Sequence, residues 1–138
     1  MIDSKLFIQE ARNCGFTTYA GVPCSFLKSF INYINDSNEI DYIPAANEGD
    51  AIAIAAGVYL GGEYSVVMLQ NSGLGNAINP ITSLLQTFKI PVLIVVTLRG
   101  DPFSSPDEPQ HQLMGEITTN LLDLMKIPWS WFPTENSN

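Results

Sequence analysis

One glutamate, Glu48, is a candidate functional residue because of its place in the chain. It follows a short β-prone run and begins a helix-forming segment, residues 48–60, that is rich in alanine and glycine. A carboxylate there could simply complement the helix dipole, an effect of about 0.3–1 kcal/mol at an exposed first turn. The small residues also permit close approach by another backbone or a flat ligand. Because alanine is the best helix former, composition leaves both interpretations open.

The only histidine, His111, falls in the long irregular stretch of residues 99–112. Imidazole titrates near neutrality, so general acid or base catalysis is one interpretation and a solvated loop side chain is the other. Cys24 is expected at the same edge of the fold, which makes a thiolate–imidazole pair and a thiol hydrolase a further hypothesis. No acid or amide is clearly placed to orient that imidazole.

Two further segments carry groups that could bind anions. Arg99 ends an apolar run and could pair with an anionic substrate, or with Asp101 on the surface. Residues 71–76 read NSGLGN, which resembles an anion-binding glycine loop but lacks the Lys and Ser/Thr of a phosphate loop. The alternative is a simple turn in which Asn76 caps the following helix.

A repeated strand–turn–helix step must position these residues. Such alternation is typical of a parallel sheet with helices on both faces. The predicted strands are residues 16–21, 40–45, 64–70 and 91–98, and the predicted helices are residues 3–14, 26–34, 48–60, 75–88 and 113–125.

The apolar run at 92–97 is nearly continuous, which predicts a strand buried on both faces in the middle of the sheet. In open parallel sheets, ligands bind at the carboxyl ends of the strands, where the strand order reverses. The loops that hold Cys24, Glu48, Ser72 and Arg99 all belong to that edge.

Bulk properties narrow the possible functions. A chain of 138 residues that is 46% hydrophobic suits one domain with a continuous core. The net charge of −8 argues against binding nucleic acid or an anionic membrane surface. Two cysteines are too few for a disulfide framework and lack metal-ligand spacing, and no signal peptide or membrane span is visible. We therefore expect a cytoplasmic protein with no metal site of its own.

The motifs taken together resemble the pyrimidine-binding domain of thiamine-diphosphate-dependent 2-oxoacid decarboxylases. The resemblance is greatest to the phosphonopyruvate decarboxylases, with the sulfopyruvate decarboxylases next. It covers nearly the whole chain in the right order, and NEGDA is its specific part. The matching segments read AGVP, AANEGDAIAIAAG, NSGLGNAINP, PVLIVVTLRG and DEPQHQLMGE.

The resemblance implies a three-layer α/β/α fold whose mostly parallel sheet has five or six strands. It also implies decarboxylation of 3-phosphonopyruvate to phosphonoacetaldehyde, with Glu48 hydrogen-bonded to N1′ of the cofactor's aminopyrimidine. His111 matches one member of a histidine pair found in relatives, while Gln110 stands at the other position. The implied cofactor-binding residues are Glu48, Pro23, Asn71, Ser72 and Gly73, and the implied substrate-binding residues are Ser25, Arg99 and Gln110, with Lys28 as a further candidate cation.

The family's Gly-Asp-Gly…Asn signature, which holds the cofactor's diphosphate through Mg²⁺, is absent from this sequence. The resemblance therefore implies half of an active site, completed by a diphosphate-binding domain or subunit, and a homo-oligomer. The chain would be part of a longer enzyme or the smaller subunit of a split one. Residues 1–133 would form the domain and 134–138 the start of a linker. A non-catalytic flavodoxin-like binding module is the alternative from another class.

Overall fold

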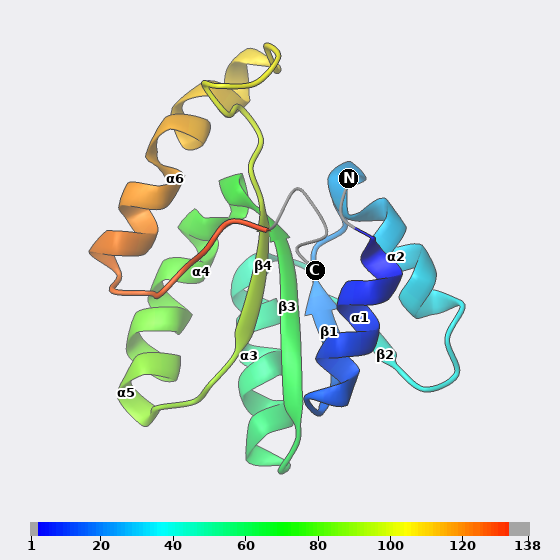
Figure 1. The fold of residues 1–138 in the computed structure, drawn as a ribbon. Helices are drawn as coiled ribbons and strands as arrows, with labels where there is room; N and C mark the ends of the chain where they lie inside the picture. The colour runs from blue at the N-terminus through cyan, green and yellow to red at the C-terminus, as the bar shows by residue number, and fades with distance from the viewer. Residues whose placement is uncertain (1–2, 133–138) are drawn as a thin grey trace.

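The computed structural model describes residues 3–132 and shows one parallel sheet between two layers of helices (Figure 1). The predicted α/β class is thus confirmed. The prediction of five or six strands is wrong for this part of the chain, because the residues after the last helix, 125–132, join no strand. The strands are β1 (Phe16–Gly21), β2 (Asp41–Pro44), β3 (Tyr64–Gln70) and β4 (Leu93–Thr97), in the order β2-β1-β3-β4.

The buried central strand is β3, and the expectation that residues 92–97 lie mid-sheet is wrong. Val66 and Met68 of β3 are fully buried, and β3 pairs with both β1 and β4. Within residues 3–132, β4 pairs with β3 alone, and Leu93 is 37% exposed. Val95 is buried in the core on one face of β4, and Ile94 and Val96 are partly buried against the core on the other. The apolar sequence of β4 therefore serves both faces of the sheet, even though its outer edge is open.

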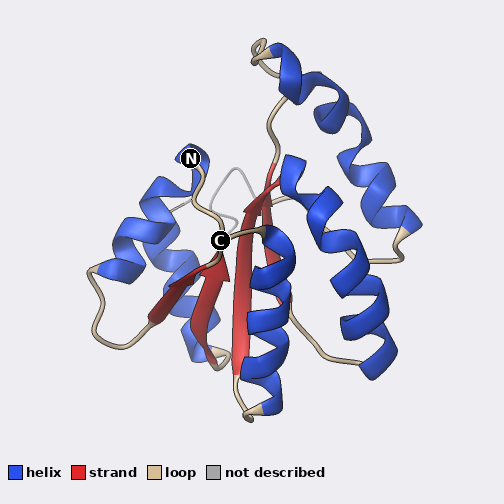
Figure 2. Ribbon diagram, turned by 180° about the vertical axis from the view of Figure 1, so that it is seen from behind, coloured by secondary structure: helices blue, strands red, loops and turns tan. Residues whose placement is uncertain are grey.

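Side chains alternate across the sheet and divide the core in two. The helices are α1 (Ser4–Asn13), α2 (Lys28–Asn35), α3 (Glu48–Leu60), α4 (Leu74–Pro80), α5 (Gln86–Phe88) and α6 (Gln112–Leu124). Tyr19 and Met68 pack with α1 and α2 on one face, whereas Ala20 and Leu69 pack with α3, α4 and α6 on the other. Figure 2 shows these helix layers from behind.

The predicted helix at 75–88 forms with an irregularity in its middle. Pro80 lies inside the helical run and has no backbone N–H to donate. The next five residues, Ile81–Leu85 (η3), widen into a π-helix before α5 completes the run. Three short 3-10 helices precede longer ones: η1 (Ser25–Leu27), η2 (Asn71–Gly73) and η4 (Pro109–His111).

The chain passes from β1 to β2 in one direction along the sheet and then to β3 and β4 in the other. The carboxyl ends of β1 and β3 therefore form the point where strand order reverses, the usual ligand site of such sheets. At this edge η2 follows β3 directly, and η1 and α3 begin a short loop after β1 and β2. The loop between β4 and α6 extends past the same edge (Figure 1).

Candidate active site

Glu48 begins α3 beside the start of α4. Asn47 caps α3, its side chain accepting a hydrogen bond from the Asp50 backbone N–H at 3.1 Å. The half-buried Glu48 carboxylate accepts a hydrogen bond at Oε2 from Asn76 Nδ2, at 2.8 Å. Within residues 3–132, this is the one hydrogen bond of the carboxylate, so Oε1 has no hydrogen-bond partner there.

The backbone of η2 lies directly against the Glu48 side chain. A Cβ atom at Gly73 would lie 2.3 Å from Cγ, Cδ and Oε1 of Glu48, far inside van der Waals contact. Only glycine at position 73 leaves room for the observed carboxylate. The predicted cofactor-binding residues Glu48 and Gly73 are therefore in contact.

Asn76 is a functional candidate that the sequence analysis missed. Its predicted role as a helix cap is wrong, because α4 begins at Leu74, before it, and has no side-chain cap. Asn76 instead lies inside α4 and its amide reaches Glu48. Asparagine is a poor residue for a helix interior, and this was the signal that could have found it.

Asn71 ties three elements together at the end of β3. Its side chain is fully buried, and Nδ2 donates to the Arg99 carbonyl at 2.9 Å and to Thr118 Oγ1 at 3.1 Å. Its Oδ1 accepts from the Arg99 backbone N–H at 3.1 Å. The side chain thus joins β3, the end of β4 and α6, and its role in the pyrimidine pocket stays a prediction.

A chain of polar contacts crosses the carboxyl ends of β1, β3 and β4. Gln70 Nε2 donates to Ser72 Oγ at 2.6 Å, and Cys24 Sγ lies 3.4 Å from Gln70 Oε1 and 3.8 Å from Thr97 Oγ1. Among the described residues, Gln70 and Thr97 are the hydrogen-bond partners of the thiol, and His111 is not one of them. The thiolate–imidazole pair of the hydrolase hypothesis is therefore not formed.

Arg99 pairs with Asp107 rather than with Asp101, which corrects that alternative. Arg99 Nε and Nη2 each lie 2.6 Å from a different oxygen of Asp107, which also accepts from the Gly100 N–H at 3.1 Å. The hydrogen bond from Arg99 holds the pKa of Asp107 far below its usual range. The guanidinium carbon also lies 4.7 Å from the centre of the Phe26 ring. A cavity of about 320 Å³ adjoins this pair.

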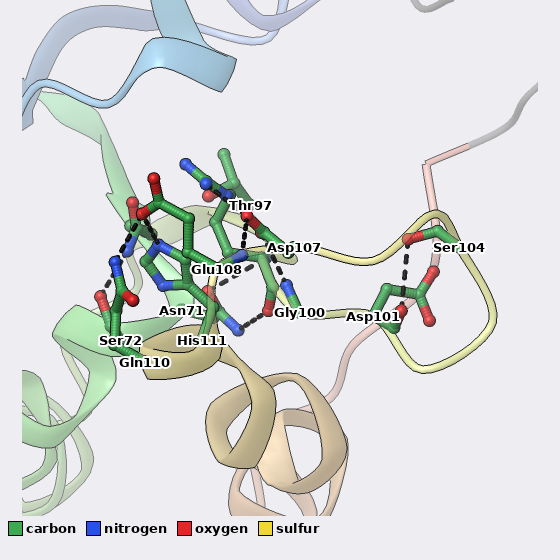
Figure 3. Close-up of polar contacts among 12 residues, drawn as sticks. Asn71, Ser72, Thr97, Gly100, Asp101, Ser104, Asp107, Glu108, Gln110 and His111 are labelled. Atoms are coloured by element: carbon green, nitrogen blue, oxygen red, sulfur yellow. Dashed lines mark hydrogen bonds and ion pairs between the residues drawn. The ribbon is translucent and has the colours of Figure 1, made fainter.

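His111 lies at the end of η4 beside two other polar side chains (Figure 3). Its Nε2 lies 3.8 Å from Glu108 Oε2, and the same oxygen accepts from Gln110 Nε2 at 2.5 Å. His111 Nδ1 is buried and has no hydrogen-bond partner within the described residues. The imidazole therefore retains a nitrogen that no described residue hydrogen-bonds.

Two glycines fix the ends of the loop that precedes α6. Gly100 has φ +72°, and a Cβ there would lie 2.2 Å from the His111 carbonyl oxygen. A Cβ at Gly115 of α6 would lie 1.7 Å from the Gly100 carbonyl oxygen. The end of β4 and the start of α6 therefore meet backbone to backbone.

The remaining predicted residues lie on the surface of the same edge. Pro23 lies in the loop after β1, Ser25 begins η1, and Lys28 begins α2, and all three are exposed. Over residues 3–132, no cluster of three acidic, histidine or cysteine side chains could hold a metal ion. No helix in that range is both long enough and apolar enough to cross a membrane.

The geometry is thus a parallel sheet with a helix-initiating glutamate packed against η2, which follows β3 at the switch point. Comparisons of the sequence with known families agree with this geometry. The chain belongs to the family described as thiamine pyrophosphate enzyme, N-terminal TPP binding domain, which it matches over residues 4–124. The predicted family is thus confirmed.

Individual relatives are decarboxylases. The chain is 46% identical over 133 residues to a phosphonopyruvate decarboxylase of Streptomyces viridochromogenes, covering 96% of this chain and 33% of the relative. It is 41% identical over 116 residues to the sulfopyruvate decarboxylase subunit alpha of Methanococcus maripaludis, covering 83% of this chain and 68% of the relative. The chain thus spans about a third of the phosphonopyruvate decarboxylase that it matches.

One solved structure has a similar fold. The thiamine diphosphate-dependent 4-hydroxybenzoylformate decarboxylase of Rhodococcus jostii RHA1 superimposes with a TM-score of 0.62. The match covers 80% of this chain and 22% of that one, at 24% identity. At this identity the likeness supports the fold alone.

Proposed function

We propose that this chain is the pyrimidine-binding half of a thiamine-diphosphate-dependent enzyme that decarboxylates 3-phosphonopyruvate to phosphonoacetaldehyde and CO₂. Two phosphonopyruvate decarboxylases support this substrate, at 46% and 44% identity over 96% of the chain. Sulfopyruvate is the second candidate substrate, because the chain covers 68% of a sulfopyruvate decarboxylase alpha subunit. A chain that covers most of an alpha subunit fits the role of one subunit in a two-subunit enzyme.

The position of Glu48 is the observation that carries the proposal. Its carboxylate has one oxygen bound to Asn76 and one oxygen beside the bare backbone of Gly73. An aminopyrimidine is flat and carries a ring nitrogen that can share a proton with a carboxylate. The residues present therefore fit the cofactor that the family binds.

Glu48 would hold the proton shared with N1′ of the aminopyrimidine, and Pro23, Ser72 and Gly73 would line the ring. Asn71 would support this wall by tying η2 to the end of β4. When bound, the cofactor supplies the carbon nucleophile and accepts the electron pair released as CO₂ leaves.

The substrate would lie toward the loop between β4 and α6. Arg99 could bind the anionic end of the substrate, but Asp107 already occupies two of its donors, so the anion would have to share or displace Asp107. A neutral Ser25 suits a dianionic substrate, because a carboxylate there would repel it. His111 Nδ1, which is buried and has no hydrogen-bond partner among residues 3–132, would handle a proton or contact the substrate, with Gln110 beside it.

The site requires a second component. A diphosphate-binding domain or subunit would contribute Mg²⁺ and the remaining wall, and we expect a cytoplasmic homo-oligomer. Isothermal titration calorimetry of this chain with thiamine diphosphate and Mg²⁺ tests this point. We expect weak binding until the second component is added, whereas a stand-alone binding module would bind its ligand as this chain.

Replacing Glu48 by Gln in the complete enzyme tests the proposed function. We expect kcat to fall by about 10²-fold or more, the usual contribution of a proton-transferring side chain. Glu63→Gln is the matched control, because Glu63 is exposed beyond the far end of α3. Decarboxylation by Glu48→Gln at near the wild-type rate would contradict the proposal. Comparing kcat/KM for 3-phosphonopyruvate and sulfopyruvate decides the substrate.

A further inference from the structure

We propose that Asn76 is a positioning residue that determines which oxygen of Glu48 exchanges a proton with the cofactor. This inference rests on the proposed function of Glu48. In this arrangement Glu48 Oε1 carries the exchanged proton, and Oε2 only accepts the hydrogen bond from Asn76. The side chain of Asn76 would touch neither cofactor nor substrate and would act through Glu48.

The first argument is the chemistry of the contact. Asn76 Nδ2 lies 2.8 Å from Glu48 Oε2, and an amide nitrogen can donate hydrogen bonds but cannot accept them. A proton on Oε2 would face that donor with no acceptor. The contact therefore keeps Oε2 unprotonated, and Oε1 is the oxygen left to bind and release a proton.

The second argument is the packing around the carboxylate. Gly73 lies against Cγ, Cδ and Oε1 of Glu48, where a Cβ would be only 2.3 Å away. Gly49, the next residue of α3, lies so near α4 that a Cβ there would be 3.0 Å from the Asn76 carbonyl oxygen. The starts of α3 and α4 are therefore held close together. This spacing lets a side chain as short as asparagine span the gap to Glu48.

Removing the Asn76 side chain is expected to slow the reaction more than it weakens substrate binding. Without Asn76, the Glu48 side chain has an additional free acceptor and more freedom to rotate, so fewer molecules present Oε1 to the ring nitrogen. One hydrogen bond to a charged group corresponds to roughly 10- to 100-fold in rate. We expect kcat to fall by that factor while KM changes about twofold or less.

The test compares Asn76→Asp and Asn76→Ala with wild type and Glu48→Gln in the complete enzyme. Asn76→Asp keeps the shape but removes the donor, and Asn76→Gln restores a donor at this exposed position. Asn79→Asp is the control, because it makes the same charge change one turn further along the helical run, away from Glu48. Its Oδ1 accepts from Ser83 Oγ at 3.0 Å.

Two measurements are made besides decarboxylation. The exchange of the C2 proton of bound thiamine diphosphate for deuterium, followed by NMR after acid quenching, reports activation of the cofactor without substrate. In the chain without cofactor, the Asn76 side-chain amide signals should shift in Glu48→Gln and stay unchanged in Glu63→Gln.

The proposal expects exchange to be slowed by about 10-fold or more in Asn76→Asp and Asn76→Ala, partly restored in Asn76→Gln and unchanged in Asn79→Asp. Wild-type exchange in Asn76→Ala, together with loss of exchange in Glu48→Gln, overturns the role of Asn76 alone. Wild-type exchange in Glu48→Gln overturns the proposed function and this inference with it. Should Asn76→Asp fail to fold, Asn76→Ala decides, because alanine favours the helix.

Discussion

Arg99 and Asp107 form a two-point ion pair across eight residues of an irregular loop. Both contacts are 2.6 Å, and the two side chains are only 16% and 19% exposed. Asp107 also accepts backbone N–H bonds from Gly100 and Glu108. A single carboxylate therefore closes the loop and holds the guanidinium beside Phe26.

The first prediction concerns the stability of the folded protein at acidic pH. Because Arg99 lowers the pKa of Asp107 in the folded protein, the stability contributed by Asp107 is complete above its unfolded pKa, about 3.9. This stability is lost progressively as the pH falls below that value toward the folded pKa. Asp107→Asn should be less stable than wild type at neutral pH, and the difference should shrink as the pH falls below 3.9.

Thermal unfolding followed by circular dichroism between pH 7 and pH 2.5 measures this effect. Asp36→Asn is the control, since Asp36 is exposed at the end of α2. A difference between wild type and Asp107→Asn that stays constant over the whole range would mean that the ion pair does not shift the Asp107 equilibrium.

The second prediction concerns Gly73. Gly73→Ala places a methyl group 2.3 Å from Glu48, so the carboxylate must move. We expect destabilisation of about 1–3 kcal/mol, typical of overpacking, and a large loss of decarboxylation. Gly75→Ala is the matched control two residues on, where a Cβ meets no atom within 4 Å.

Urea unfolding and steady-state kinetics of both alanine variants give the comparison. Equal activity of Gly73→Ala and Gly75→Ala would show that the observed Glu48 conformation is not needed for the reaction.

The third prediction concerns the buried amide of Asn71. Asn71→Ala leaves the Arg99 backbone and Thr118 without this partner in a buried environment. Because unpaired buried groups cost about 1–3 kcal/mol each, we expect a loss of roughly 2–4 kcal/mol in the free energy of unfolding. Urea denaturation measures it, with the exposed Asn120→Ala on α6 as control. A loss below about 0.5 kcal/mol would contradict the stabilising role assigned to the hydrogen bonds from Asn71 to Arg99 and Thr118.

The fourth prediction concerns Tyr19, whose side chain is fully buried and whose hydroxyl has no hydrogen-bond partner among the described residues. Tyr19→Phe should leave the protein equally stable or stabilise it by about 1 kcal/mol, because an unpaired buried hydroxyl is removed. Destabilisation beyond about 1 kcal/mol would indicate a contact that the hydroxyl makes.

Alkaline pH provides a second measurement on the same variant. Burial raises the pKa of Tyr19 to about 12, because the folded protein disfavours the ionised phenolate. The preference of the folded state for the neutral phenol is fully satisfied below pH 10, and the folded protein loses stability relative to the unfolded chain as the pH rises through 12. Tyr19→Phe should therefore lose less stability than wild type between pH 10 and pH 12. The exposed Tyr64→Phe serves as control.

Much of the fold could be predicted from sequence because strand and helix patterns are local. Residues 16–21 and 64–70 form strands at the predicted bounds, and α3 begins at Glu48 as expected. Strand order is not local. An apolar run such as residues 92–97 is produced equally by a central strand and by an edge strand whose side chains pack against the core on both faces, so the position of β4 could not be read from it.

The sequence offers candidate site residues, whose roles stay predictions, but it does not reveal their contacts. Glu48 could be singled out because its motif is specific, but its partner Asn76 lies 28 positions later and is brought to it by the packing of two helices. Asp107 was missed for a similar reason. The nearer Asp101 looked like an equal partner for Arg99 until the path of the loop placed Asp107 on it.

The backbone contact between Gly100 and Gly115 makes the loop between β4 and α6 a closed unit. Its two ends are joined by main-chain atoms, while Phe103 near its tip is 96% exposed. Insertions or exchanges between Asp101 and Pro106 should therefore leave the sheet and α6 unchanged. A different tip could therefore be grafted onto this base without rebuilding the domain.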